Sequence, residues 1–140
     1  MWVCAMKLDE TYVKEIFTLL ENSKNQEFFK YVDDNVIWQV MGTHPLAGTY
    51  HNKASFITST FGRLATVLQE GGVILKVENL LIIGPFAIVE MRSLSHTKSG
   101  KPFDNTYCWI AKFDGGKIAK VKAYVDSALV ADVINSNSNL

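Results

Sequence analysis

Three short turns divide the second half of the chain, residues 73–126, into alternating segments, and this pattern most constrains the fold. The turns are Gly84-Pro85, Lys98-Ser99-Gly100 and Asp114-Gly115-Gly116. Turns of this length and composition join antiparallel neighbours. Because side chains alternate between the two faces of a strand, the length of each turn also decides which residues share a face. The segment therefore predicts an antiparallel meander.

The last turn sets the predicted register. We assign it as a three-residue loop that places Trp109 opposite Val121, because a two-residue loop would put Trp109 beside Lys122 and mix charge into an aromatic face. The preceding turn then places Val89 opposite Trp109. The face predicted to point inward is apolar with a few polar groups, and it consists of Ala87, Val89, Met91, Ser93, Asn105, Tyr107, Trp109, Val121, Ala123 and Val125.

The first half of the chain predicts helices around one strand. Apolar residues recur at helical spacing from Thr11 to about Asn22, where Asp9 offers an N-cap, and a short second helix follows from Asn25. Residues 36–41 alternate as a strand with two largely apolar faces. Residues 53–69 carry one long apolar stripe, which indicates a single long helix.

Composition limits the class of protein. The 140 residues are 48% hydrophobic, which predicts one domain over residues 1–140, with flexible tails at 1–8 and 135–140. Fourteen basic residues balance fourteen acidic ones, and no basic run argues for nucleic acid. No segment approaches the roughly 18 apolar residues of a membrane span, so we expect no membrane partner.

Cysteines and histidines give no metal signature. Cys4 and Cys108 lack the spacing of metal ligands, so we expect free thiols, a reducing cytoplasmic location and no metal. His44 precedes Pro45 in a loop and His51 lies just before a helix, so a structural or solvated role is favoured for both. Nothing in the sequence requires a cofactor.

Helices followed by a meander predict an α+β cone, with N-terminal helices packed on a strongly curved, mainly antiparallel mixed sheet. The motifs VIWQVMG, LAGTYHNKASF and FDGGKIAKVKAYVD resemble the nuclear transport factor 2-like (NTF2-like) superfamily, which has a cystatin-like cone, and especially its SnoaL-like and ketosteroid isomerase-related members. The resemblance implies a hydrophobic pocket between the inner sheet face and the helices. It also implies a homodimer through the outer sheet face.

The alternating strands supply the predicted pocket wall, joined by Trp38 or Gln39 from the first strand. Such a wall suits a small apolar molecule held by few hydrogen bonds, whereas the alternative is a solid core. The predicted ligand-binding residues are Trp38, Gln39, Val89, Met91, Asn105, Trp109, Val121 and Ala123.

The resemblance also suggests catalytic residues. Gln39 matches the position of the base in ketosteroid isomerases, and an amide does not accept a proton at neutral pH, so typical steroid isomerase activity is not expected. Asp126 matches the aspartate that often ends the last strand of SnoaL-like cyclases, and we predict it as a catalytic residue together with Tyr107. The alternative is that Asp126 caps a helix formed by residues 128–134.

These features predict a small-molecule-binding SnoaL-like protein. Its chemistry would be proton transfer of the cyclase, isomerase, dehydratase or hydrolase type on a small apolar substrate. Two alternatives stay open, namely a ligand-binding or carrier domain without catalysis and a dimeric protein-interaction domain. The sequence does not decide whether the chain is an enzyme.

Overall fold

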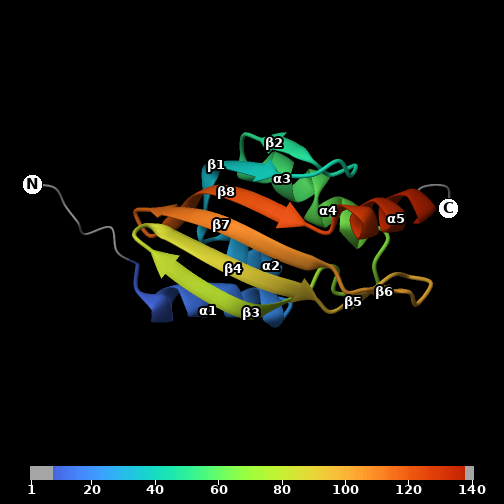
Figure 1. Ribbon diagram of the computed structural model, residues 1–140, viewed down its shortest axis with the longest axis horizontal. Coiled ribbons are helices and arrows are strands. Elements are labelled where there is room, and N and C mark those ends of the chain that lie inside the picture. The colour runs from blue at the N-terminus through green and yellow to red at the C-terminus, as the bar shows by residue number, and fades with distance from the viewer. Residues whose placement is uncertain (1–7, 138–140) are drawn as a thin grey trace, which may run out of the picture.

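The computed structural model describes residues 8–137, which form helices packed on a curved sheet (Figure 1). The helices are α1 (Glu10–Glu21), α2 (Asn25–Phe29), α3 (Lys53–Ser59), α4 (Phe61–Ala65) and α5 (Ser127–Asn137). The strands are β1 (Val32–Val40), β2 (Gly48–Tyr50), β3 (Leu75–Ile83), β4 (Phe86–Ser93), β5 (Ser95–His96), β6 (Pro102–Phe103), β7 (Thr106–Asp114) and β8 (Lys117–Val125). The predicted α+β architecture is confirmed.

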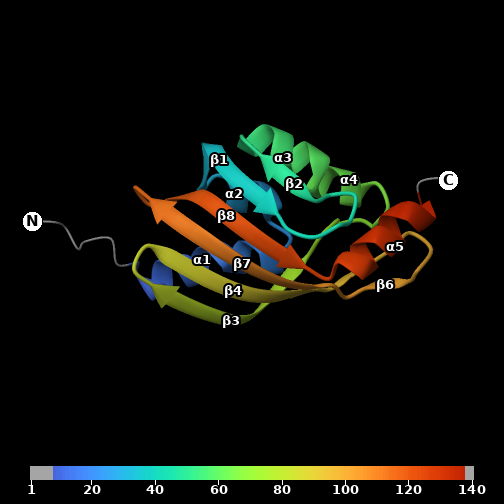
Figure 2. The same cartoon turned by 45° about the horizontal axis from the view of Figure 1, so that its top comes forward.

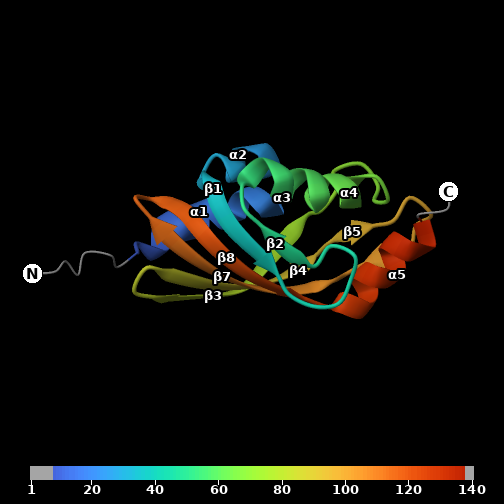
Figure 3. The same ribbon diagram turned by 90° about the horizontal axis from the view of Figure 1, so that it is seen from above.

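Six strands form one open sheet in the order β2-β1-β8-β7-β4-β3, and β5 and β6 form a separate hairpin. The β1 and β8 pair is parallel and every other named pair is antiparallel, so the sheet is mixed as expected. Figure 3 shows α1 to α4 gathered on one face of this sheet. That face becomes the interior of the molecule.

The register between β7 and β8 differs from the prediction. Asp114 pairs with Lys117 across a two-residue turn, and both glycines of this turn have positive φ values of 60° and 84°. A register shift after Phe113 then leaves Ala119 without a partner, so that Trp109 lies opposite Ala123 rather than Val121. The extra residue on β8 is a β-bulge. The bulge keeps the aromatic face intact, which a two-residue turn alone would not have done.

Residues 53–69 do not form the single long helix that the sequence predicted. The chain breaks at Thr60, where φ is −118° and ψ is −81°, and this residue separates α3 from α4. The Thr60 hydroxyl donates to the carbonyl oxygen of Phe56 at 2.7 Å. A threonine that bonds the carbonyl four residues earlier favours a bend, and Gly62 weakens the following turn.

Aromatic rings fill the space between the helices and the sheet. Phe28 lies within 5.4 Å of Phe17 and 6.3 Å of Trp109, measured between ring centroids, and so joins α1 and α2 to β7. Phe29 makes an edge contact of 5.2 Å with Phe61. These contacts extend the core from the N-terminal helices to α4.

The ends of the described chain are anchored. The amide of Leu8 donates to the carbonyl oxygen of Gly84 at 3.3 Å, and residues 135–137, predicted as tail, belong to α5. Figure 2 shows α5 beside β6, where Lys101 forms an ion pair with Asp132. The other predicted tail residues, 1–7 and 138–140, and Cys4 lie outside the described part. Within residues 8–137, no helix is long and apolar enough to cross a bilayer.

Candidate functional site

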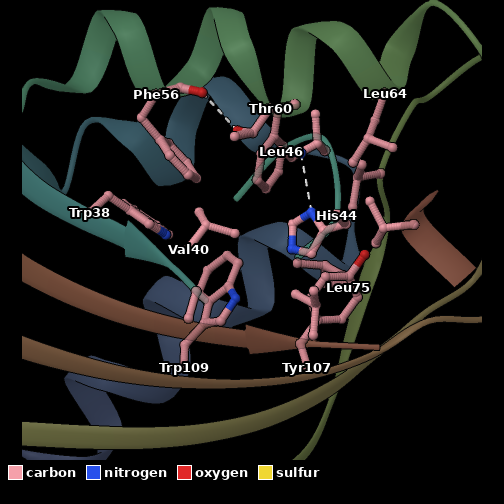
Figure 4. Close-up of a pocket in the computed structure, with 15 residues that line it drawn as sticks. Trp38, Val40, His44, Leu46, Phe56, Thr60, Leu64, Leu75, Tyr107 and Trp109 are labelled. Carbon is pink, nitrogen blue, oxygen red and sulfur yellow. Dashed lines mark hydrogen bonds between the residues drawn. The ribbon is translucent and has the colours of Figure 1, made fainter. Parts of the chain in front are cut away.

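An apolar cavity of about 50 Å³ lies between the inner sheet face, the α3–α4 segment, the loop after β1 and the start of α5 (Figure 4). The surface that faces the open space is apolar, and none of the lining residues is acidic, lysine or arginine. The lining residues are Trp38, Val40, His44, Leu46, Phe56, Thr60, Phe61, Leu64, Val73, Leu75, Tyr107, Trp109, Ala123, Val125 and Val130.

Trp38 forms one wall of the cavity from β1. Its side chain is 0% exposed and stacks on Phe56 with 3.9 Å between ring centroids and 15° between ring planes. Trp109 meets the same indole edge-on at 5.0 Å. The buried Nε1 of Trp38 has no hydrogen-bond partner within residues 8–137. In Figure 4 this nitrogen points toward the space between the labelled side chains.

Tyr107 reaches the cavity from β7. Its hydroxyl is buried and also lacks a hydrogen bond of normal geometry in the described part of the chain. Burial raises the pKa of Tyr107 to about 12, although nearby Asn105 and Ser93 act in the opposite direction. The phenol is therefore protonated and uncharged at physiological pH, and it can donate a hydrogen bond.

Asn105 stabilises the backbone next to the cavity without lining it. It is fully buried, and its Oδ1 accepts from the amides of Thr106 at 3.0 Å and Asp126 at 3.2 Å. Its Nδ2 has no partner among the described residues. Asn105 thus ties the start of β7 to the residue that precedes α5, but it does not line the cavity.

His44 is a lining residue that the sequence analysis did not place in the wall. The amide of Leu46 donates to its Nδ1 at 3.1 Å, which leaves Nε2 to donate to the carbonyl oxygen of Met41 at 3.0 Å. Burial lowers the pKa of His44, with the Met41 carbonyl acting in the opposite direction. Both ring nitrogens are thus engaged by the backbone of their own loop. His44 therefore has a structural role in the loop. The sequence feature that could have indicated this role is Gly42, two residues earlier, because its φ of 115° lets the loop turn back toward the interior.

Asp126 lies outside the cavity. It is exposed, and its Oδ1 accepts from the amide of Leu129 at 3.3 Å in the first turn of α5. This is the helix-cap alternative that the sequence left open. The strand alternation explains it, because Val125 faces the cavity and its successor turns outward.

Gln39 is also outside the cavity, because alternation along β1 turns it away from the face that carries Trp38. It pairs with Thr49 of β2 and Lys122 of β8 and is half-buried. Of the predicted binding residues, the structure brings together Trp38, Trp109 and Ala123, joined by Tyr107. The others are buried without lining the space, namely Val89, Met91, Asn105 and Val121.

The position of α1 explains why part of the inner sheet face does not line the cavity. This helix covers the β3 side of the sheet, where Glu21 Oε2 accepts from the amide of Val77 at 2.9 Å and Phe17 contacts Trp109. The inner face is therefore filled where α1 covers it, and the cavity lies near β1, β8, the start of β7 and Leu75 at the start of β3. Alternation identifies an inner face, but it does not show which part of that face a helix covers.

Among residues 8–137, no group of histidine, cysteine, aspartate and glutamate is arranged to hold a metal ion. Cys108 is a half-buried free thiol whose pKa burial raises, with Glu90 acting in the same direction. It does not line the cavity.

Comparison with solved structures identifies the fold. An NTF2-like protein of Burkholderia thailandensis superposes with a TM-score of 0.74 at 22% identity, covering 89% of this chain and 95% of that one. A cystatin-like protein of Xanthomonas campestris has a TM-score of 0.72 at 15% identity, covering 88% and 95%. A protein of Catenulispora acidiphila with a ketosteroid isomerase-like fold, solved in complex with trimethylamine, has a TM-score of 0.63 at 13% identity, covering 84% and 86%. The chain therefore has the NTF2-like fold that its motifs indicated.

Comparison with curated proteins finds fungal cyclases. The dimerizing cyclase phiC of a fungal species is 27% identical over 133 residues, which are 93% of this chain and 58% of the relative. The dimerizing cyclase tstC of Talaromyces stipitatus is 28% identical over 114 residues, or 78% and 50%. The chain thus spans about half the length of the curated relatives it matches. No family model matches the chain.

Proposed function

We propose that this NTF2-like chain binds a small, mainly apolar molecule in the cavity beneath Trp38 and Trp109. The observation that carries the proposal is the apolar hollow itself, which lies between the sheet and α3–α4, whereas Val89, Met91 and Val121 of the inner face are buried without lining it. Pockets for small molecules are typically concave and apolar with few polar groups, and this one has that character.

The size of the hollow sets a condition on binding. Its volume of about 50 Å³ is smaller than the roughly 150 Å³ of an apolar cavity that binds benzene. A ligand of that size must therefore spread the wall. The loop that carries His44 and Leu46 contributes to the wall without being part of a helix or strand, and it is the segment that we propose moves.

The chemistry that we propose is of the cyclase type, as in the names of the curated relatives. The wall contains no carboxylate, and both His44 nitrogens are engaged, so the cavity holds no free base for neutral pH. Catalysis would then come from holding a flexible substrate in a reactive conformation, with the Tyr107 hydroxyl as hydrogen-bond donor. Asp126 has no part in this proposal.

The same lack of a base favours a second candidate, a carrier that binds without chemistry. The two differ in one respect, because a positioning enzyme lowers the barrier of a reaction whereas a carrier leaves its ligand unchanged. Product formation by the protein, measured by mass spectrometry on compounds that bind, separates them. Turnover that Tyr107→Phe slows supports the enzyme, and binding without turnover supports the carrier.

We also propose that two copies pair through the outer sheet face. An apolar row crosses this face, in which Leu81 lies opposite Ile88 and Ile88 lies opposite Ile110. Leu81 is 54% exposed, and Ile83 on the same edge strand is 66% exposed. Ile88 and Ile110 are half-buried. A continuous row of exposed and half-buried apolar residues fits a protein interface better than a solvated surface.

Thermal shift measurements with toluene and cyclohexanone test the binding proposal. Ligand that binds only the folded state raises the melting temperature. Ala123→Leu fills the cavity from β8, Val130→Phe fills it from α5, and Ala54→Leu is the matched control on an exposed helix position. We expect the control to keep the shift and both filled variants to lose it. Equal shifts in all of them would show that the compounds bind elsewhere.

A further inference from the structure

We infer that the cavity selects uncharged compounds with two carbonyl-type oxygens, one held by the Nε1–H of Trp38 and the other by the hydroxyl of Tyr107. The inference rests on the proposed function and names the class of molecule that the site takes. Ketones, esters, lactones and anhydrides share the required chemistry, which is a neutral hydrogen-bond acceptor on an apolar frame.

The first support is the pair of unsatisfied donors. Nearly all buried polar groups in proteins have a hydrogen-bond partner, so an exception calls for an explanation. Within residues 8–137, only four buried side-chain atoms lack one, and two of the four belong to cavity-lining residues, Trp38 and Tyr107. A third, Nδ2, belongs to Asn105, whose side chain is close enough to the Tyr107 phenol to lower its pKa. Two of the unpaired atoms thus belong to residues in the wall of one cavity, and a third belongs to a residue beside that wall.

The chemistry of these donors decides what they bind. An indole nitrogen only donates, so the missing partner of Trp38 is an acceptor, and the protonated phenol of Tyr107 can donate to an acceptor as well. A carboxylate is a poor candidate, because its burial needs a cation and the wall holds no lysine or arginine. His44 does not fill that role, since both of its nitrogens bond to backbone atoms. Neutral carbonyl oxygens fit.

The register indicates two oxygens rather than one. Trp38 lies opposite Val121 of β8, whereas Tyr107 lies opposite Val125, four residues further along the same strand. At about 3.3 Å per residue, the two positions are offset by roughly 13 Å along the sheet. Figure 4 shows the two side chains entering from different sides of the cavity. Each donor therefore holds its own oxygen.

The apolar surface of the hollow fits this inference. Neither donor atom is exposed to the open space, so each lies just within the wall. A ligand large enough to spread the wall reaches both donors, whereas a smaller one meets only carbon atoms. Recognition of the oxygens is thus coupled to the opening that ligand size already requires.

The test compares two compounds of the same shape, para-cyclohexanedione and para-dimethylenecyclohexane, in which each oxygen is replaced by a methylene group. Proton–nitrogen correlation spectra follow the indole N–H of Trp38, assigned by its disappearance in Trp38→Phe. We expect the dione to move this resonance downfield, as a new hydrogen bond does, and the hydrocarbon to leave it nearly unchanged.

Tyr107→Phe tests the second donor. We expect it to weaken binding of the dione roughly three- to tenfold, the range for one neutral hydrogen bond, and to change binding of the hydrocarbon less than about twofold. Tyr124→Phe, on the exposed outer face, is the matched control and should change neither affinity. Because phenylalanine keeps the ring, the variant isolates the hydroxyl.

The outcomes distinguish selection of oxygens by the two donors from ligand binding in the cavity as such. If both compounds bind equally well and the Trp38 indole does not respond, the donors do not select oxygens and the inference fails, while the cavity remains a binding site. If neither compound moves any resonance of the lining residues, the proposed function fails and takes the inference with it.

Discussion

Trp38 of β1 and Phe56 of α3 lie face to face, with 15° between their ring planes and 3.9 Å between centroids. The stack joins the sheet to the helix directly at the cavity and fixes the orientation of the indole. Because the Trp38 nitrogen is the donor at one end of the site, this contact decides where a ligand oxygen would lie.

Phe56→Leu should therefore reduce both stability and order at the cavity. The loss of a stacked pair and of buried volume should lower the free energy of unfolding by about 1 to 2 kcal/mol. Urea unfolding measures the loss, with Phe61→Leu as the control, since Phe61 is only half-buried and makes no face-to-face stack. A Phe56 variant as stable as wild type would show that the stack adds nothing.

Asp126 should behave as a helix cap. Asp126→Ala should lower the free energy of unfolding by about 0.5 to 2 kcal/mol, because the amide of Leu129 loses its acceptor, whereas Asp126→Asn keeps an oxygen there and should lose less. Neither change should affect ligand binding, measured by titration. A folded Asp126→Asn protein that has lost turnover would restore the aspartate as a catalytic residue.

Gly42→Ala should destabilise the protein through both conformation and contact. The position has a φ of 115°, and an added Cβ would collide with the Ser127 hydroxyl and lie 3.0 Å from the His44 ring. Gly100→Ala is the matched control, because its φ is 93° but no atom lies within 4 Å of the added carbon. We expect the Gly42 variant to lose at least about 1 kcal/mol more than the control in urea unfolding. Equal losses would show that the loop yields to the collision.

His44 should make stability fall on acidification. Its folded-state pKa lies below the ordinary value of 6.5, so the unfolded chain binds the proton more strongly. The stability that the neutral ring contributes is thus complete above about pH 6.5 and is lost as pH falls below that value. Unfolding free energies measured across this range should decline less in His44→Asn than in wild type. Parallel curves for the two proteins would exclude His44 as the cause.

Ile110→Lys should separate a dimer that forms through the outer sheet face, because it replaces one residue of the apolar row with a charge. Leu94→Lys is the control, since Leu94 is 50% exposed but lies beyond the end of β4. Light scattering after gel filtration gives the mass of each variant. If wild type is a monomer, or if both variants stay dimeric, the proposed interface is wrong.

The sequence predicted those features that depend on local periodicity and turn chemistry. Asp9 caps α1 as expected, since its side chain accepts from the amide of Thr11, and Val89 lies opposite Trp109. The β7–β8 register was missed by two residues because a bulge on β8 compensates for the shorter turn, and a bulge has no strong sequence signal. An offset of two leaves every side chain on its predicted face, so the inner face was still identified.

The candidate site was less predictable, because its limits depend on what covers the sheet. The alternation of Trp38 and Gln39 showed that one faces inward, but only the packed helices decide which. His44 lines the cavity because its loop folds back onto the interior, and no periodicity reports that. Alternation turns Asp126 outward only if β8 stays regular up to Val125, and the sequence does not show whether the strand bends there.

The position of Val130 has a consequence for how the site comes into being. This residue closes one end of the cavity, yet it belongs to α5, the last helix described, whose start is held by Asn105. As the ribosome extends the chain, the sheet and the earlier helices precede that wall. The cavity is thus completed only after the sheet and the earlier helices have been made, and a nascent chain that has not yet docked α5 would expose an open, apolar hollow.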